Sequence, residues 1–241
     1  MLELKDVSKS YRKTKAVDKV SFSVEGGQTL GIVGANGAGK TTLISMIATL
    51  LKPDSGQILL DGTDLVGEPD RVRPYIGYVP QDIALYEQLS GLDNMKFWGR
   101  AAGVPKDVLS RRIEEVGKII GFDKKLLKKK VSACSGGMKR RLNIGVALLH
   151  SPKLVIMDEP TAGIDMQSGD QILEAIEELR KSGIAIIYVG HYMEEIERIA
   201  THLLVMNGGR AVAYGRKEEV LDGKPLGELI SDIGRRNNNN T

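Results

Sequence analysis

A glycine-rich segment between an apolar run and a helical pattern constrains the fold of this chain more than any other feature. Residues 34–41 read GANGAGKT; they follow the strand-like residues 28–33, which end in an apolar run, and precede residues 42–51, which are apolar at helical spacing. Glycines let a backbone bend so that successive N–H groups converge on an anion at the positive end of the following helix. The pattern GxxxxGK[ST] in this setting predicts a phosphate-binding loop between a strand and a helix.

The chemistry of this loop divides among its residues. Lys40 is expected to place its cation on the β- and γ-phosphates, Thr41 to ligate Mg²⁺, and Thr42 to add a hydroxyl. A glycine-rich turn before an ordinary helix is the alternative, but chance produces the pattern in about one chain in a hundred of this length. We therefore expect a nucleotide site made by Asn36, Gly37, Ala38, Gly39, Lys40, Thr41 and Thr42.

Short apolar runs recur along the chain and predict strands. They lie at residues 2–7, 20–24, 57–60, 75–79, 154–157, 184–189 and 203–206. Continuous apolar strands are typical of a parallel sheet buried on both faces. Helical patterns lie between several of them, as at residues 172–179, which indicates an α/β core with a mostly parallel sheet. Residues 87–150 read as helices alone, which predicts an inserted helical subdomain.

Composition excludes several classes of protein. With 41% hydrophobic residues the chain can bury a core, and 34 basic against 31 acidic residues is too mild a balance for a nucleic-acid binder. The single cysteine, Cys134, excludes an intrachain disulfide and fits a reducing cytoplasm. The longest apolar runs have strand length rather than the roughly 20 residues that span a bilayer. Residues 1–13 lack the apolar core of a signal peptide.

A second acidic element follows a buried strand. Residues 154–160 read LVIMDEP, so two carboxylates stand at the carboxyl end of that strand, where ligands bind in α/β sheets. Asp158 is expected to hold Mg²⁺ through water, and Glu159 to act as a general base on the attacking water. A surface turn after a core strand is the alternative, and the phosphate loop favours the metal and the base.

Residues 134–138 read CSGGM and lie upstream of that acidic pair. The loop, this short signature and Asp158-Glu159, in this order, resemble the nucleotide-binding domains of ABC transporters over nearly the whole chain. The resemblance implies an ATPase that uses ATP and Mg²⁺. It implies a P-loop NTPase core with an N-terminal antiparallel β subdomain and a helical subdomain at about 87–150. We expect one domain at 1–233 and a disordered, low-complexity tail at 234–241.

The resemblance also implies roles for isolated residues. Tyr11 would stack on adenine with Val17 nearby, and Gln81 would sense Mg²⁺ and the membrane partner. Asp165 would lie in the loop between dimer halves, and His191 would be the switch histidine at the γ-phosphate. Each residue alone has an ordinary alternative, such as a surface aromatic or a structural histidine. Only the ordered set is specific.

The signature has its own physical interpretation. Ser135 is a good N-cap for a helix at 138–149, and two glycines leave N–H donors free for an anion. The resemblance implies that this anion is the γ-phosphate bound to a second subunit, so that ATP lies between Lys40 of one copy and Ser135, Gly136 and Gly137 of the other. The commonest signature has Leu and Gln where this chain has Cys134 and Met138. Signatures ending in Met are similar to those of export systems with a stand-alone ATPase.

The expected partners are therefore a second copy of the chain and integral membrane permease subunits on a separate chain, with no nucleic acid. The expected location is the cytoplasmic face of the cell membrane, as a peripheral subunit, and the catalytic residues are Lys40, Glu159 and His191. A soluble ABC ATPase in cofactor assembly or repair shares every motif and stays open. A binding clamp without turnover would lack the base, and a P-loop kinase would lack the signature. We interpret the lysines in residues 124–130 as a solvated helix face, and Phe97 and Trp98 as core.

Overall fold

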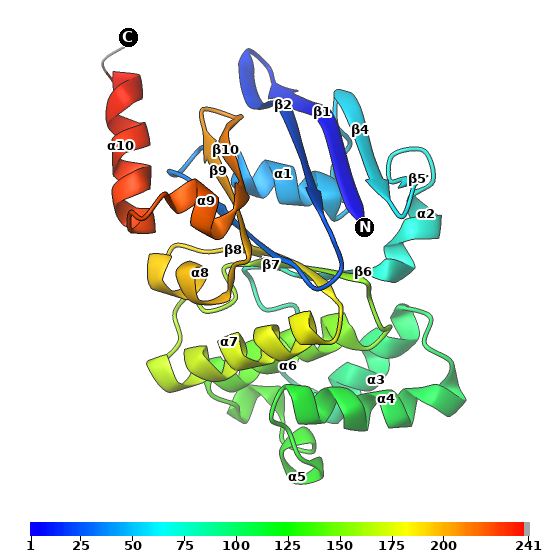
Figure 1. The fold of residues 1–241 in the computed structure, drawn as a ribbon. Helices are drawn as coiled ribbons and strands as arrows, with labels where there is room; N and C mark the ends of the chain where they lie inside the picture. The colour runs from blue at the N-terminus through cyan, green and yellow to red at the C-terminus, as the bar shows by residue number, and fades with distance from the viewer. Residues whose placement is uncertain (239–241) are drawn as a thin grey trace.

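A six-stranded sheet in the order β10-β9-β3-β8-β7-β6 forms the centre of the molecule (Figure 1). In the computed structural model, which describes residues 1–238, neighbouring strands of this sheet are parallel except β10, which pairs antiparallel at one edge. The strands are β3 (Thr29–Val33), β6 (Ile76–Val79), β7 (Leu154–Asp158), β8 (Ala185–Val189), β9 (His202–Asn207) and β10 (Arg210–Arg216).

Alternate residues of the central strands enter two separate hydrophobic cores. Every residue of β3, β7 and β8 is buried. In β8, Ile186 and Tyr188 belong to one core, and Ile187 and Val189 belong to the other. A sheet covered on both faces needs strands that are apolar throughout, because each face packs against other elements. The expectation of a mostly parallel, doubly covered sheet is confirmed.

A smaller antiparallel sheet covers one side of the core, in the order β2-β1-β4-β5. Helix α1 (Lys40–Ile47) lies between the two sheets (Figure 1). Its Leu43 and Ile44 share a core with Leu2 of the small sheet and Ile32 of the central one. The expected N-terminal antiparallel subdomain is thus confirmed. Its strands are β1 (Leu2–Tyr11), β2 (Thr14–Val24), β4 (Ser55–Leu60) and β5 (Thr63–Asp64).

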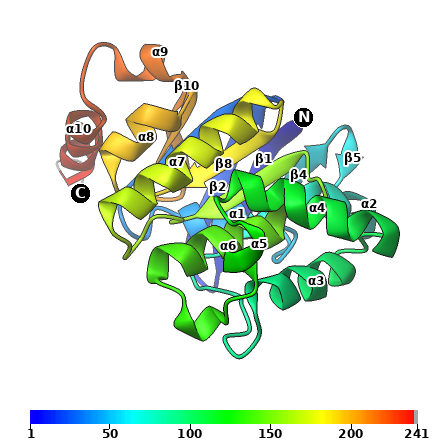
Figure 2. The same cartoon turned by 90° about the horizontal axis from the view of Figure 1, so that it is seen from below.

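Helices cover the other face of the central sheet. Residues 87–150 contain helices, turns and one isolated bridge between Ser90 and Lys130, as the expected helical subdomain requires. Figure 2 shows these helices grouped beside α7. The helices of this layer are α3 (Gly91–Ala101), α4 (Lys106–Ile119), α5 (Lys124–Leu127), α6 (Gly136–Leu148) and α7 (Met166–Lys181). Shorter or peripheral helices are α2 (Pro69–Val72), α8 (Met193–Ile199), α9 (Lys217–Leu221), α10 (Leu226–Asn238) and two 3₁₀ turns (Arg73–Tyr75 and Val131–Ala133).

Helix α10 corrects the expectation of a disordered tail for residues 234–238. Its apolar residues recur at helical spacing, and Leu226, Leu229, Ile230 and Ile233 pack against the core on the helix-covered face of the sheet. This packing supports a helix that extends to Asn238. The rest of the expected tail, 239–241, lies outside the described residues.

Two further surface expectations have opposite outcomes. The lysines of residues 124–130 are all exposed, as a solvated face requires. Phe97 and Trp98 are both expected in the core, but Phe97 is 45% exposed and packs edge-on against Tyr86 and Trp98, whereas Trp98 is half-buried. Within residues 1–238, none of the helices combines the length and apolar character needed to cross a bilayer.

Candidate functional site

The glycine-rich segment forms the loop between β3 and α1, as predicted. Gly34 and Gly39 have positive φ angles of 149° and 98°. A Cβ atom would lie 2.1 Å from the Met206 carbonyl oxygen at Gly34, and 2.0 Å from the Ala16 carbonyl oxygen at Gly39. Only glycine fits at either position, because the loop is pressed between β9 and β2. The N-terminus of α1 therefore stands at the end of β3, where free helix N–H groups attract anions.

Lys40 begins α1 and turns its ammonium group back onto this loop. Its Nζ donates to the Gly34 carbonyl at 2.7 Å and to the Ala35 carbonyl at 3.1 Å. The side chain is only 8% exposed, and this burial lowers the pKa of Lys40, while the charges of Glu159 and Asp158 act to raise it. A buried cation thus lies where the loop closes, with two carboxylates near enough to influence its titration.

The two predicted carboxylates follow β7 in different environments. Asp158 is the last residue of the strand and is buried, which raises its pKa; repulsion from Glu159 adds to the effect, and the charges of Lys40 and His191 oppose it. Glu159 leaves the strand with a φ of 48°, and its N–H donates to the Val189 carbonyl at 2.8 Å. Residues other than glycine seldom adopt this conformation, and it recurs at functional sites.

Glu159 has a separate partner for each carboxylate oxygen. The Gln81 side-chain amide donates from Nε2 to Oε2 at 3.0 Å, and the His191 Nε2 atom lies 2.6 Å from Oε1. Gln81 comes after β6, Glu159 after β7 and His191 after β8, so the carboxyl ends of three adjacent parallel strands meet here. The structure therefore brings three of the predicted site residues into direct contact.

A pocket of about 310 Å³ joins the loop to Glu159 and His191. Tyr11, half exposed, stands at its rim. Val17, predicted to lie beside the base, is fully buried in the core instead, and Ala16 lines the pocket. Successive residues of a strand point to opposite faces, so Ala16 faces the pocket and Val17 faces the core. The lining residues are Tyr11, Ala16, Asn36, Gly37, Ala38, Gly39, Lys40, Thr41, Thr42, Glu159, Val189 and His191.

The signature residues do not line this pocket. Ser135 is the N-cap of α6, and its Oγ accepts a hydrogen bond from the Met138 N–H at 3.2 Å, as predicted. Gly137 lies against the start of α7, where a Cβ would come within 2.1 Å of Ser168 Oγ. Asp165 caps α7 by accepting from the Ser168 N–H at 3.0 Å. The signature and Asp165 thus lie together, apart from the phosphate loop of their own chain.

Residues 17–162 match the family described as ABC transporter (ABC_tran). The chain belongs to the ABC transporter family. Linearmycin resistance ATP-binding protein LnrL of Bacillus subtilis (strain 168) is 42% identical over 220 residues, which cover 91% of this chain and 70% of that protein. Nod factor export ATP-binding protein I of Cupriavidus pinatubonensis (strain JMP 134 / LMG 1197) is 36% identical over 234 residues, which cover 97% of this chain and 72% of that protein.

A solved structure of the ATP binding subunit of an ABC transporter is similar over 97% of this chain and 99% of its own, with a TM-score of 0.87 and 29% identity. This chain is accordingly an ATP-binding subunit of an ABC transporter and an ATPase. The expected fold class is confirmed by the same likeness.

Sequence reasoning missed a connection inside this ABC ATPase between the signature helix and Gln81. Arg140 on α6 is 6% exposed, and its Nη1 donates to the Gln81 carbonyl at 2.6 Å and to the Pro80 carbonyl at 3.2 Å. Asn143, one turn further along α6, accepts from the Ala84 N–H at 3.1 Å. The loop that carries Gln81 is therefore fastened to α6. Two polar residues one turn apart, Arg140 and Asn143, were the only signal in the sequence.

A buried network behind Glu159 and His191 was also missed. Glu195 Oε2 accepts hydrogen bonds from Thr161 Oγ1 at 2.6 Å and from the Tyr188 hydroxyl at 2.7 Å. Burial raises the pKa of Tyr188, and the hydrogen bond to Glu195 adds to this, so the phenol stays protonated. Thr161 stands two residues after Glu159, and Glu195 four residues after His191. The network therefore fixes these two segments relative to each other.

Proposed function

We propose that this ABC ATPase binds ATP with Mg²⁺ in the pocket at the phosphate loop, and that a second copy of the chain completes each site. The observation that carries the proposal is the place of the signature. Ser135, Gly136 and Gly137 offer the N–H groups of a helix start, yet they do not line the pocket of their own chain. A nucleotide held by Lys40 meets them when two copies associate head to tail, so two ATP molecules lie in one dimer interface.

The residues present suit Mg²⁺. Thr41, Gln81 and Asp158 offer hydroxyl, amide and carboxylate oxygens, which are the ligands that this hard cation prefers. Within the described residues, no hydrogen bond or ion pair reaches the buried Asp158 carboxylate, so it is free to hold the waters of a metal ion. Residues 1–238 contain no group of three or more His, Cys, Asp or Glu side chains that could hold a metal by themselves. Magnesium commonly keeps several waters and completes its shell with phosphate oxygens, where it neutralises developing charge.

The pocket residues divide the hydrolysis of ATP among themselves. Lys40 offsets the charge of the phosphates in the bound state, because its ammonium group is held at the loop. Glu159 accepts the proton of the attacking water, and its two oxygens are oriented by Gln81 and His191. His191 lies at the pocket wall, where its ring contacts the γ-phosphate. Cleavage of that phosphate removes the charge that the opposing signature binds, so hydrolysis reopens the dimer.

Closing and reopening of the dimer would drive separate membrane subunits, with the ATPase held at the cytoplasmic face of the membrane. A surface groove lies between β6 and the helices, with a volume of about 300 Å³, and its lining includes Tyr78, Trp98 and Val146. Exposed Tyr86 and Phe97 stand beside Trp98. This apolar surface next to the Gln81 loop is suited to receive a membrane partner. The names of the resistance and export relatives favour export as the direction of transport.

Two measurements test these proposals. The purified chain should hydrolyse ATP slowly and be mostly monomeric without ATP. Co-expression with a multi-spanning membrane protein encoded by a neighbouring gene should bring it to the membrane fraction and raise its ATPase rate. A chain that stays in the soluble fraction with every such candidate, and copurifies with a cytosolic assembly complex, would overturn the transport role and favour the soluble ATPase.

A further inference from the structure

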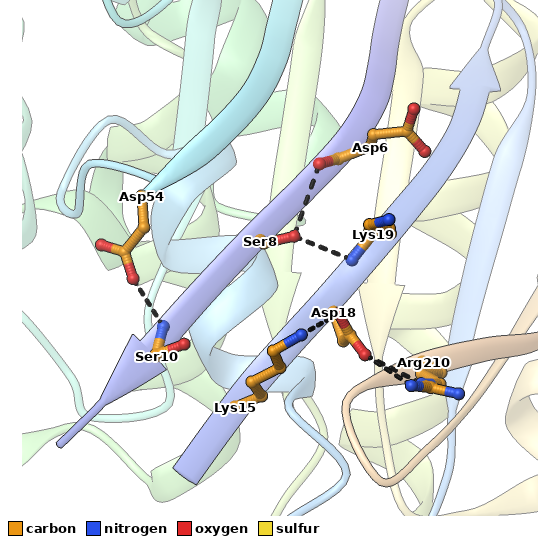
Figure 3. Close-up of polar contacts among 8 residues, drawn as sticks. All are labelled: Asp6, Ser8, Ser10, Lys15, Asp18, Lys19, Asp54 and Arg210. Atoms are coloured by element: carbon orange, nitrogen blue, oxygen red, sulfur yellow. Dashed lines mark hydrogen bonds and ion pairs between the residues drawn. The ribbon is translucent and has the colours of Figure 1, made fainter. Parts of the chain in front are cut away.

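Asp18 in β2 is a buried carboxylate that receives cations from two parts of the chain (Figure 3). Its side chain is 8% exposed. Lys15 Nζ donates to Oδ1 at 2.9 Å, and Arg210 reaches Oδ2 with Nε at 2.9 Å and with Nη2 at 2.8 Å. The Lys15 hydrogen bond, and after it the Arg210 hydrogen bond, hold the pKa of Asp18 below its ordinary value. The ion pair between Asp18 and Arg210 therefore joins β2 to the start of β10.

Backbone contacts extend this link to the phosphate loop. The Asp18 N–H donates to the Gly209 carbonyl at 2.8 Å, and the Gly209 N–H donates to the Ala38 carbonyl at 3.2 Å. Gly209 has a φ of 81°, and a Cβ there would lie 3.0 Å from the carbonyl oxygens of Ala16 and Lys15. The turn between β9 and β10, the strand β2 and the phosphate loop meet at Gly209, which leaves no room for a larger residue.

The same stretch of β2 forms a part of the pocket wall that lies outside the phosphate loop. Asp18 follows Ala16 by two residues in β2, next to an irregularity in the pairing with β1 between Val17 and Val20. Ala16 and Tyr11 line the pocket together with the loop, whereas Asp18 and Arg210 do not touch it. Any displacement of β2 against the turn would therefore move this wall relative to the phosphate loop.

We propose that the Asp18–Arg210 contact is a positioning device that holds the base-side wall, Tyr11 and Ala16, against the phosphate loop. It rests on the proposed function, since it assumes that ATP binds in this pocket. The contact sets how much of the ATP affinity comes from the nucleoside part, and it leaves the affinity for the phosphates unchanged. Asp18 and Arg210 are thus positioning residues, which act through the placement of β2.

The test compares two ligands on the Arg210→Met variant, which keeps the length of the side chain but removes its guanidinium group. Dissociation constants are measured by calorimetry for ATP and for inorganic tripolyphosphate, both with Mg²⁺, together with kcat and KM for ATP. We expect ATP binding to weaken by about 3- to 5-fold, the upper range for an ion pair whose arginine is largely exposed. Tripolyphosphate binding and kcat at saturating ATP should stay unchanged, and KM should rise with the dissociation constant.

Two matched variants separate positioning from general electrostatic attraction. Lys19 is exposed and lines the same surface groove as Lys15 and Arg210, and it has a φ of 50°, which asparagine tolerates. Lys19→Asn therefore removes one positive charge nearby and should change neither dissociation constant. Arg210→Lys keeps a cation within reach of Asp18 and should restore most of the ATP affinity.

An equal weakening of ATP and tripolyphosphate, an equal loss of ATP affinity in Lys19→Asn, or no change for either ligand would each overturn the positioning role. If thermal melting shows that Arg210→Met does not fold, the same two dissociation constants, for ATP and for tripolyphosphate, are compared in the isosteric Asp18→Asn variant. Failure of the proposed function is distinguishable, because the wild-type chain would then bind neither ligand in this pocket.

Discussion

The two halves of the proposed ATP site differ in how one chain builds them. The phosphate-loop half is assembled inside the chain: Gln81 and His191 come from the ends of strands on either side of β7, and each contacts Glu159. The signature half has only local contacts, since Ser135 caps its own helix and Gly137 packs on the neighbouring helix start. Under the proposed function, a single chain holds ATP and its catalytic base, and closure over the γ-phosphate requires a second chain.

The largest effect should come from removing the base in the phosphate-loop half. Glu159→Gln keeps the shape of the side chain but removes its charge and basicity, so kcat should fall by about 10²- to 10⁴-fold, or about 3 to 5 kcal/mol of barrier. ATP affinity should hold or increase, because repulsion between the carboxylate and the γ-phosphate is relieved. Glu174→Gln, at an exposed position on α7, is the matched control in the ATPase assay. Hydrolysis at the wild-type rate by Glu159→Gln would remove the base assignment.

A second variant should sharpen the comparison by separating binding from hydrolysis. Lys40→Ala removes the buried cation of the loop, so calorimetry should show ATP affinity reduced by about a hundredfold while the fold stays intact. Lys52→Ala, which removes an exposed cation after α1, should bind ATP as the wild type does. Undiminished affinity in Lys40→Ala would contradict the assignment of the phosphate loop.

A smaller effect is expected behind the site, at the hydroxyl of Tyr188. Tyr188→Phe removes one of the two hydrogen bonds to Glu195 that fix His191 relative to Glu159. We expect kcat to fall by about 3- to 10-fold with an unchanged dissociation constant for ATP. Tyr214→Phe, which removes a hydroxyl bonded to Ser23 in the small sheet, is the control. A loss of affinity equal to the loss of kcat would argue for a purely structural role.

The same contrast explains what the sequence could reveal. The loop between β3 and α1, the buried strands and the cap of α6 depend on neighbours in the chain, so local patterns predicted them. The contact of Arg140 with the Gln81 carbonyl joins residues about sixty positions apart, and no local pattern contains it. Ala16 lines the pocket in place of the predicted Val17, and this depends on which face of β2 meets the loop. The strand's residues alone leave this undecided, because both side chains are small and apolar.

Helix α10 illustrates a different reason for a missed element. The polar residues at the end of the chain suggested disorder, whereas Leu226, Leu229, Ile230 and Ile233 before them form an apolar face. That face packs against the core, with Leu226 fully buried and the other three residues partly buried. Tertiary packing of an amphipathic face supplies most of the stability of a helix in a protein. The prediction gave weight to the polar composition at the end of the chain and overlooked the helical spacing of the apolar residues just before it.

The most direct test of the shared site is the mass of the ATP-bound protein, measured by size exclusion with light scattering. Glu159→Gln with saturating ATP should run as a stable dimer, while the wild type with ADP should run as a monomer. Adding Ser135→Arg to Glu159→Gln places a bulky cation in the signature, so the double variant should still bind ATP through its own phosphate loop but should run as a monomer. A double variant that dimerises, or a Glu159→Gln chain that stays monomeric with ATP bound, would contradict the account.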